Sequence, residues 1–346
     1  MAKTGFRQAD LPQPSRASSY DIASWILMGM ALFLVLRLHL LPALLAGLSV
    51  YELVQVLAEA LKVVRIHRKQ GKLAAVGILA ALVVLLLMLA GTGIIAFVRA
   101  DNLTALLNKM ADSLDSWRAA LPDSIADQLP TDVDELRQSV VAWLRPHAGQ
   151  LQHAGAEAGR TLAHILFGMG IGALVSLYDV QPRASLGPLA TALQERAGRL
   201  GEAFRRVVFA QVRISAVNTL LTGLYLFVTL PLAGVHLPLA KTMLVITFLV
   251  GILPVIGNLV SNTMIVVLSL SVSLSVAIAS LLFLVVIHKL EYFLNAHLIG
   301  TQIRAHAWEL LLAMLAMEAA FGMPGLIAAS IYYAYVKDEL VSRNLV

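Results

Sequence analysis

Runs of apolar residues divide the chain into eight hydrophobic segments separated by polar links. An upright helix needs about 20 apolar residues to cross a hydrocarbon core of about 30 Å. The segments cover residues 22–38, 40–58, 73–98, 161–178, 207–230, 242–257, 262–287 and 307–336. Because most of them approach or exceed that length, the pattern predicts an all-α integral membrane protein. Some segments are expected to be broken or re-entrant helices.

Residues 99–160 form a polar insert between the third and fourth hydrophobic segments. Its apolar residues recur at helical spacing, which predicts an extracytoplasmic amphipathic helical insert. Two interpretations stay open: a vestibule or oligomer contact, or a hairpin lying on the bilayer or on the protein's own surface. The chain would then divide into residues 1–98, this insert, and a C-terminal membrane domain over 161–346. That last domain would carry a cytoplasmic amphipathic helix at about 185–206.

Composition supports a membrane protein and gives no support to a nucleic-acid-binding one. Hydrophobic residues make up 59% of the chain and charged residues 14%, whereas soluble domains have roughly 45–50% and about 25%. The net charge is +5, and the basic residues lie between apolar segments rather than in a cluster with exposed aromatics. Lipid is therefore the expected partner, and no nucleic acid is expected. With no cysteine, disulfides and thiolate metal sites are excluded.

The distribution of lysine and arginine predicts the orientation in the membrane. These residues concentrate in the N-terminal tail, in the link at 62–72 and in residues 179–206. Loops rich in lysine and arginine stay on the cytoplasmic side. We therefore expect a multi-pass protein of a prokaryotic inner (cytoplasmic) membrane with cytoplasmic termini, and the insert at 99–160 on the opposite side.

Two Pro/Gly breaks interrupt apolar segments in the C-terminal half. The first, at 251–258, contains Pro254, Gly257 and Asn258, and the second, at 322–325, contains Pro324. The second break leaves two alternatives: one kinked, tilted helix, or two half-helices in a re-entrant hairpin. Non-helical backbone at membrane depth survives where protein or a water-filled cavity surrounds it, and transporters aim such helix ends at substrate. The breaks therefore predict a binding site, with kinks that serve packing alone as the alternative.

Few polar side chains within the apolar segments are candidates for chemistry. Glu318 lies near the middle of its segment, where a carboxylate is costly and normally faces a cavity or a partner. Asn218 and Thr222 share a helix face and are expected to line a pathway or to bond neighbouring helices. No nucleotide-binding, zinc-protease or hydrolase motif occurs in the sequence. We therefore expect neither an enzyme nor a cofactor or metal site.

Five short motifs follow one another from about residue 205 to 336. They are AQVR at 210–213, LPVIGN at 253–258, HKLEY at 288–292, LIG at 298–300 and FGMPGLIA at 321–328. In order and spacing this part of the chain resembles the autoinducer-2 exporter family, a family of putative permeases. The resemblance implies export of small signalling molecules, with sodium/proton exchange in some members, and a homo-oligomer. It also adds Glu291, within HKLEY, to the expected pathway.

Together, the residues and the resemblance predict a membrane exporter of a small polar solute or an autoinducer-2-like signalling molecule. Its transport would be facilitative or ion-coupled. Its predicted pathway includes Asn218, Thr222, Pro254, Gly257, Asn258, Glu291, Glu318 and Pro324. A cation/proton antiporter is the alternative within transport. A non-transporting scaffold or regulator that acts through residues 99–160 is the alternative from another class.

Overall fold

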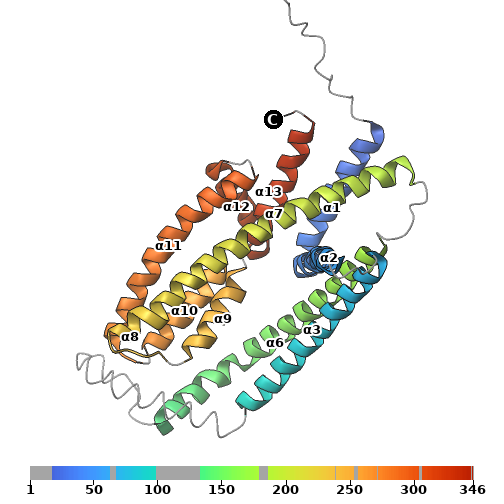
Figure 1. Cartoon of the computed structure of the whole chain (residues 1–346). Helices are drawn as coiled ribbons and strands as arrows, with labels where there is room; N and C mark the ends of the chain where they lie inside the picture. Colours follow the sequence, from blue (N-terminus) through green and yellow to red (C-terminus); the bar gives the residue numbers. More distant parts are fainter. Residues whose placement is uncertain are drawn as a thin grey trace, which may run out of the picture. The chain divides into compact units, whose positions relative to one another are not determined.

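The computed structural model is helical, with no strand among the residues that it describes (Figure 1). It describes residues 18–62, 68–98, 133–178, 186–237, 239–252, 256–270, 272–303, 306–343 and 345. The first half of the predicted insert, together with Pro254, therefore lies outside the described residues. In chain order the helices are α1 (Ser19–Arg37), α2 (Leu41–Lys62), α3 (Arg68–Val98), α6 (Val133–Tyr178), α7 (Pro188–Leu224), η1 (Tyr225–Thr229), α8 (Leu230–Leu232), α9 (Ala240–Gly251), α10 (Ile256–Leu270), α11 (Leu274–Ile303), α12 (Ala307–Phe321) and α13 (Met323–Ser342).

Within the described residues, five stretches are long and apolar enough to cross a membrane, judged by length and composition. They are Ser19–Arg37, Leu41–Leu61, Gln70–Leu89, Arg145–Tyr178 and Pro188–Leu232. Shorter apolar helices lie at Ala240–Gly251, Val260–Leu270 and Leu274–Ile287. The prediction of an all-α membrane protein with long and broken apolar segments is confirmed.

Several helices run through positions where the sequence pattern changes from polar to apolar. Helix α6 continues through residue 160, the expected end of the insert, and contains Pro146. Helix α7 joins the amphipathic stretch at 185–206 to the apolar segment that follows it. A change in polarity alters what surrounds a helix without ending it.

The apolar segment at 262–287 is instead divided between α10 and α11. The division falls in a serine-rich stretch, and the Ser273 hydroxyl accepts a hydrogen bond from the Val276 amide at 3.2 Å. Such a side-chain acceptor pairs one of the free amides at a helix start. This local capping explains why one apolar run forms two helices.

The chain forms two compact units. Unit 1 comprises residues 1–40, 182–207 and 303–346, and unit 2 comprises 41–181 and 208–302. Helix α7 contributes its first part to unit 1 and the remainder to unit 2.

An ionic cluster joins α1, α7 and α13 in unit 1. The Arg196 side chain is fully buried between two carboxylates, with Nη2 at 3.0 Å from Asp21 Oδ1 and Nε at 2.6 Å from Glu339 Oε1. Trp25 lies under the guanidinium at 5.4 Å and donates its indole N–H to Glu339 at 2.6 Å. Because each charge has an opposite partner, burial of the arginine is compensated.

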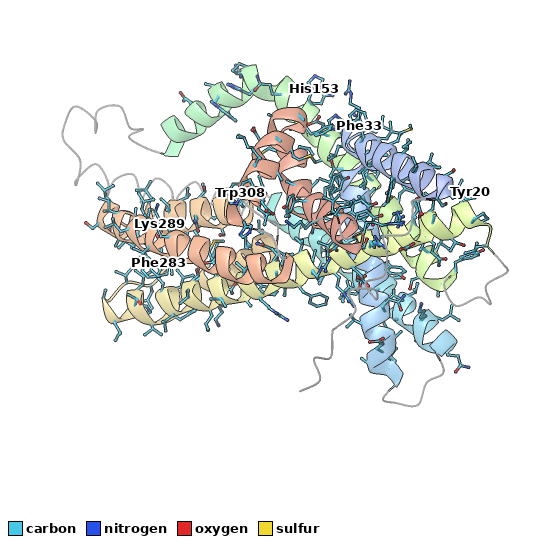
Figure 2. The ribbon with its side chains drawn as sticks, turned by 90° about the horizontal axis from the view of Figure 1, so that it is seen from above. Tyr20, Phe33, His153, Phe283, Lys289 and Trp308 are labelled. Carbon is cyan, nitrogen blue, oxygen red and sulfur yellow. The ribbon has the colours of Figure 1, made fainter. Side chains whose placement is uncertain are left out.

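Helices α12 and α13 form a tight hairpin in unit 1. Gly322, between them, has a φ of 65°, a conformation that glycine adopts without strain. A Cβ at Gly325 would lie 2.7 Å from the Met317 carbonyl carbon, so the two helices approach closely just beyond the turn. Phe33, labelled in Figure 2, packs edge-on against Phe321 at 5.8 Å. Of the two alternatives for this segment, the structure has two helices in a hairpin.

Glycines bring α2 and α6 together in unit 2. A Cβ at Gly168 would lie 2.6 Å from Ala43 Cα, and one at Gly172 would lie 2.9 Å from Gly47 Cα. Such small-residue contacts let helix backbones approach closely, which is how many membrane helices associate. The buried Lys72 side chain donates to the Ser176 carbonyl at 3.1 Å, near the C-terminal end of α6.

We expect Gly172→Ala to lower the thermal stability of the protein in detergent. The added methyl group would overlap the Gly47 carbonyl, and overpacking of this kind costs about 1–3 kcal/mol. Gly170→Ala is the matched control, because a Cβ there meets nothing within 4 Å and alanine is the better helix former. Equal unfolding midpoints for the two variants would contradict the close approach.

We expect Arg196→Met to destabilise the protein, while Arg205→Met, at an exposed position of the same helix, leaves stability nearly unchanged. Removing one partner of a buried ion pair costs about 3–5 kcal/mol. The loss here should be nearer ~2 kcal/mol, because Arg343 still lies 2.9 Å from Asp21 and Arg199 still pairs with Glu339. Thermal unfolding of both variants in detergent measures the difference.

Candidate transport site

A stripe of five polar residues runs along the second part of α7 and into η1. Gln211, Ser215, Asn218, Thr222 and Tyr225 alternate four and three residues apart, so they share one face of the helix. Each is buried, with at most 6% of its surface exposed. At about 1.5 Å per residue the stripe is roughly 21 Å long. It is therefore a continuous, buried polar face along this part of the helix.

The first two members of the stripe cap the C-terminal end of α9. A helix end leaves its last four carbonyls without helical partners, and α9 ends at Gly251 because the predicted break follows it. Gln211 donates to the Gly251 carbonyl at 2.9 Å, and Ser215 donates to the Phe248 carbonyl at 2.7 Å. Two side chains from one helix thus satisfy the broken end of another.

Glycines allow α7, α9 and α10 to meet at this level. A Cβ at Gly251 would lie 2.5 Å from Ser215 Oγ, and one at Gly257 would overlap the Val250 carbonyl and lie 2.6 Å from Gly251 Cα. Further along α7, a Cβ at Gly223 would lie 3.1 Å from Leu244. Along this contact, higher-numbered residues of α7 meet lower-numbered residues of α9, so the two helices are antiparallel. Figure 1 shows α7 beside α9 and α10.

The far end of the stripe is held by a second hydrogen-bonded group. The hydroxyls of Tyr225 and Ser280 are 2.9 Å apart, and those of Ser280 and Ser269 are 2.7 Å apart. The Tyr225 ring stacks on Phe283, labelled in Figure 2, with centroids 3.9 Å apart. Tyr225 begins the π-helical turn η1, and such turns frequently occur at functional sites. This group links η1 to α10 and α11.

Three of the predicted pathway residues lie in unit 2 at described positions. Asn218 and Thr222 are buried in the stripe, and Gly257 begins the contact of α10 with α9. Asn258 and Glu291 lie in α10 and α11, but their side chains, like Pro254, are outside the described residues.

The other two predicted residues belong to unit 1. Glu318 is exposed on α12, four residues before the hairpin turn at Gly322, and Pro324 lies in the first turn of α13. If the tip of this hairpin lies near water, Glu318 is expected at the membrane interface. That position is the alternative to a role inside the pathway.

A different carboxylate forms the ion pair of this hairpin. Glu309 Oε2 accepts from Lys337 Nζ at 3.0 Å and from the Tyr333 hydroxyl. The hydrogen bond to Glu309 raises the pKa of Lys337, which follows the apolar segment, above its usual 10.5. Lys337 therefore stays charged at neutral pH and holds the open ends of the two helices together.

Sequence reasoning missed that Gln211 and Tyr225 belong to the same face as Asn218 and Thr222. The signal is present as the alternating spacing of four and three residues along an apolar helix. No cluster of three or more His, Cys, Asp or Glu side chains suited to a metal ion occurs in the part of the chain that the structure describes. The stripe consists of neutral donors and acceptors.

A helical membrane protein with a buried polar stripe that meets a broken helix has the architecture of a membrane transporter. The family comparison assigns the chain more closely: residues 22–341 match the model of the AI-2E family transporter, and the chain belongs to that family. The resemblance inferred from the motifs is thereby confirmed. No curated protein and no solved structure matches the chain.

We expect Gln211→Leu to lower stability in detergent by about 1–3 kcal/mol, the usual cost of leaving a buried polar group unpaired. The lost donor is the one that caps the Gly251 carbonyl. Gln194→Leu, at an exposed position of the same helix, provides the control and should change stability little. If both variants unfold at the wild-type midpoint, the capping interaction does not support the break.

Proposed function

We propose that this membrane transporter exports a small polar solute, of the size and polarity of an autoinducer-2-like signalling molecule, along the α7 stripe. The observation that carries the proposal is the burial of five neutral polar side chains in one line that ends at the broken helix α9. A polar group taken from water into an apolar surrounding loses free energy unless it is hydrogen-bonded. A line of neutral donors and acceptors lowers that barrier for a solute that carries no charge.

The break between α9 and α10 supplies the moving element of the proposed mechanism. The carbonyls of Phe248 and Gly251 accept hydrogen bonds from the side chains of Ser215 and Gln211. Side-chain bonds can be exchanged for bonds to a solute without unwinding further backbone. Movement of α9 against α7 would then open and close the stripe, a form of alternating access.

The membrane and the assembly state are part of the proposal. The basic links predict cytoplasmic termini and a cytoplasmic membrane, with residues 99–160 on the other side. The motifs' resemblance to the family implies a homo-oligomer. In this arrangement export runs from the basic side to the side of the polar insert.

Cation/proton antiport is the second candidate, favoured by the end of α9 itself. Carbonyls at a helix C-terminus carry partial negative charge, and half-helix C-termini coordinate Na⁺ in transporters. Its proton carrier would be Glu318, the carboxylate predicted from the sequence.

Flux into liposomes that contain the purified protein separates the stripe from the rest of the chain. We expect Asn218→Leu and Thr222→Val each to lower solute flux about 10-fold, which corresponds to ~1.4 kcal/mol. The reason is that each removes a polar group from the line while keeping its approximate volume. Thr242→Val, at an exposed position of α9, is the control. Flux unchanged in both stripe variants would reject the α7 pathway.

The same liposomes with an imposed proton gradient distinguish the two candidates. We expect Glu318→Gln to retain solute flux, because its side chain is exposed and lies outside the stripe. A gradient-driven ²²Na⁺ flux that disappears in Glu318→Gln would establish antiport instead. If no wild-type flux of any solute or ion is found, the result favours a scaffold role through residues 99–160 over transport.

A further inference from the structure

Three buried hydroxyl groups in unit 2 take no part in the hydrogen bonds described above. Thr219 Oγ1, Thr247 Oγ1 and Ser261 Oγ are inaccessible to solvent and have no hydrogen-bond partner among the described residues. Thr247 and Ser261 are at most 2% exposed as whole residues. They come from α7, α9 and α10, the helices that meet at the broken end of α9.

Their register places the three hydroxyls at one level of this helix group. At one level, Gly251 of α9 lies close both to Ser215 of α7 and to Gly257 of α10. Thr219 follows Ser215 by four positions, Thr247 precedes Gly251 by four, and Ser261 follows Gly257 by four. These residues lie one turn away on the same helix faces, and in antiparallel neighbours the turns lead in the same direction. Three hydroxyls thus gather one turn from the capped helix end.

An unpaired hydroxyl in this position is unusual for a helical serine or threonine. Such side chains commonly bond to a carbonyl in the preceding turn of their own helix, as Ser24 does to Asp21 at 2.7 Å and Thr92 does to Met88 at 2.9 Å. Leaving a buried hydroxyl unpaired costs free energy. Three such groups at one level indicate a place where a partner from outside the chain completes the hydrogen bonds.

The surroundings indicate the charge of that partner. All the side chains identified at this level are neutral, and the carbonyls of Phe248 and Gly251 already accept bonds from Ser215 and Gln211. A buried ion would lack a compensating charge, which is costly. A hydroxyl group both donates and accepts, so it matches a solute hydroxyl in either role.

We propose that Thr219, Thr247 and Ser261 form a binding site for a neutral, polyhydroxylated small solute. This inference rests on the proposed export of a polar solute and adds the residues that bind it. The three hydroxyls replace the hydration of the solute as it leaves the capped end of α9. Sugar-derived or polyol solutes fit, whereas carboxylates, phosphates and metal cations do not.

The test combines two measurements on a triple variant, Thr219→Val, Thr247→Val and Ser261→Ala. With erythritol as the probe, we expect the KM for flux into liposomes to rise at least 10-fold. We expect the thermal unfolding midpoint in detergent to equal or exceed that of wild type, because the substitutions remove unpaired buried hydroxyls. A purely structural role would lower the midpoint instead. Thr242→Val serves as the control for both measurements.

Each other outcome decides against the site. Wild-type transport of erythritol with an unchanged KM in the triple variant overturns the site while leaving the proposed export intact. Wild-type flux of other polar solutes but not of erythritol overturns the polyhydroxylated class. A ²²Na⁺ flux lost in the triple variant, without erythritol transport, assigns the hydroxyls to a cation. A wild-type protein that moves nothing overturns the proposed function and this inference together.

Discussion

The carbonyls at the C-terminal end of α9, which lack amide partners in a following turn of helix, are the constraint on which the arrangement of unit 2 depends. In the hydrocarbon region no water is present to bond them, so the protein must supply donors. Gln211 and Ser215 do so from α7, at 2.9 and 2.7 Å. Their reach fixes α7 against α9, and that closeness requires glycine at 251, whereas the approach of α10 to the same end of α9 requires glycine at 257. The polar stripe and the glycines therefore both serve to pair the carbonyls that the break leaves at the end of α9.

At the second break in the chain, the backbone amides and carbonyls find their hydrogen-bond partners in a different way. At the α12–α13 turn the Gly322 amide donates to the Glu318 carbonyl at 2.7 Å, and the Leu326 amide donates to the Gly322 carbonyl at 3.1 Å. These bonds are local, between residues four apart, and need no side chain from another helix. The two Pro/Gly breaks look alike in sequence, yet the α9 break has described side-chain donors from α7. Coupling between a break and a polar pathway is thus supported at α9.

Much of the fold can be predicted from the sequence, because apolar length and Pro/Gly breaks act locally. The break after Gly251 and the buried face of Asn218 and Thr222 follow from composition and helical spacing alone. Helix continuity could not be predicted in the same way: α6 and α7 cross from polar to apolar sequence without a stop signal. The contact of Gln211 with Gly251 spans 40 positions, and its register depends on how two helices pack. The pairing of Glu309 with Lys337 could not be predicted either, because it depends on the hairpin that brings α12 and α13 together.

The change of residue type along α7 argues for the kind of solute that the stripe serves. Its first part carries Arg196, Arg199 and Arg206, each in an ion pair. Beyond it the buried face from Gln211 to Tyr225 carries amides and hydroxyls alone, and the one arginine in this stretch, Arg213, is exposed. Charged side chains at membrane depth are costly and are kept where ions or protons move. A stripe that avoids charge over roughly 21 Å offers an ion little compensation, whereas it offers a neutral solute a succession of hydrogen bonds.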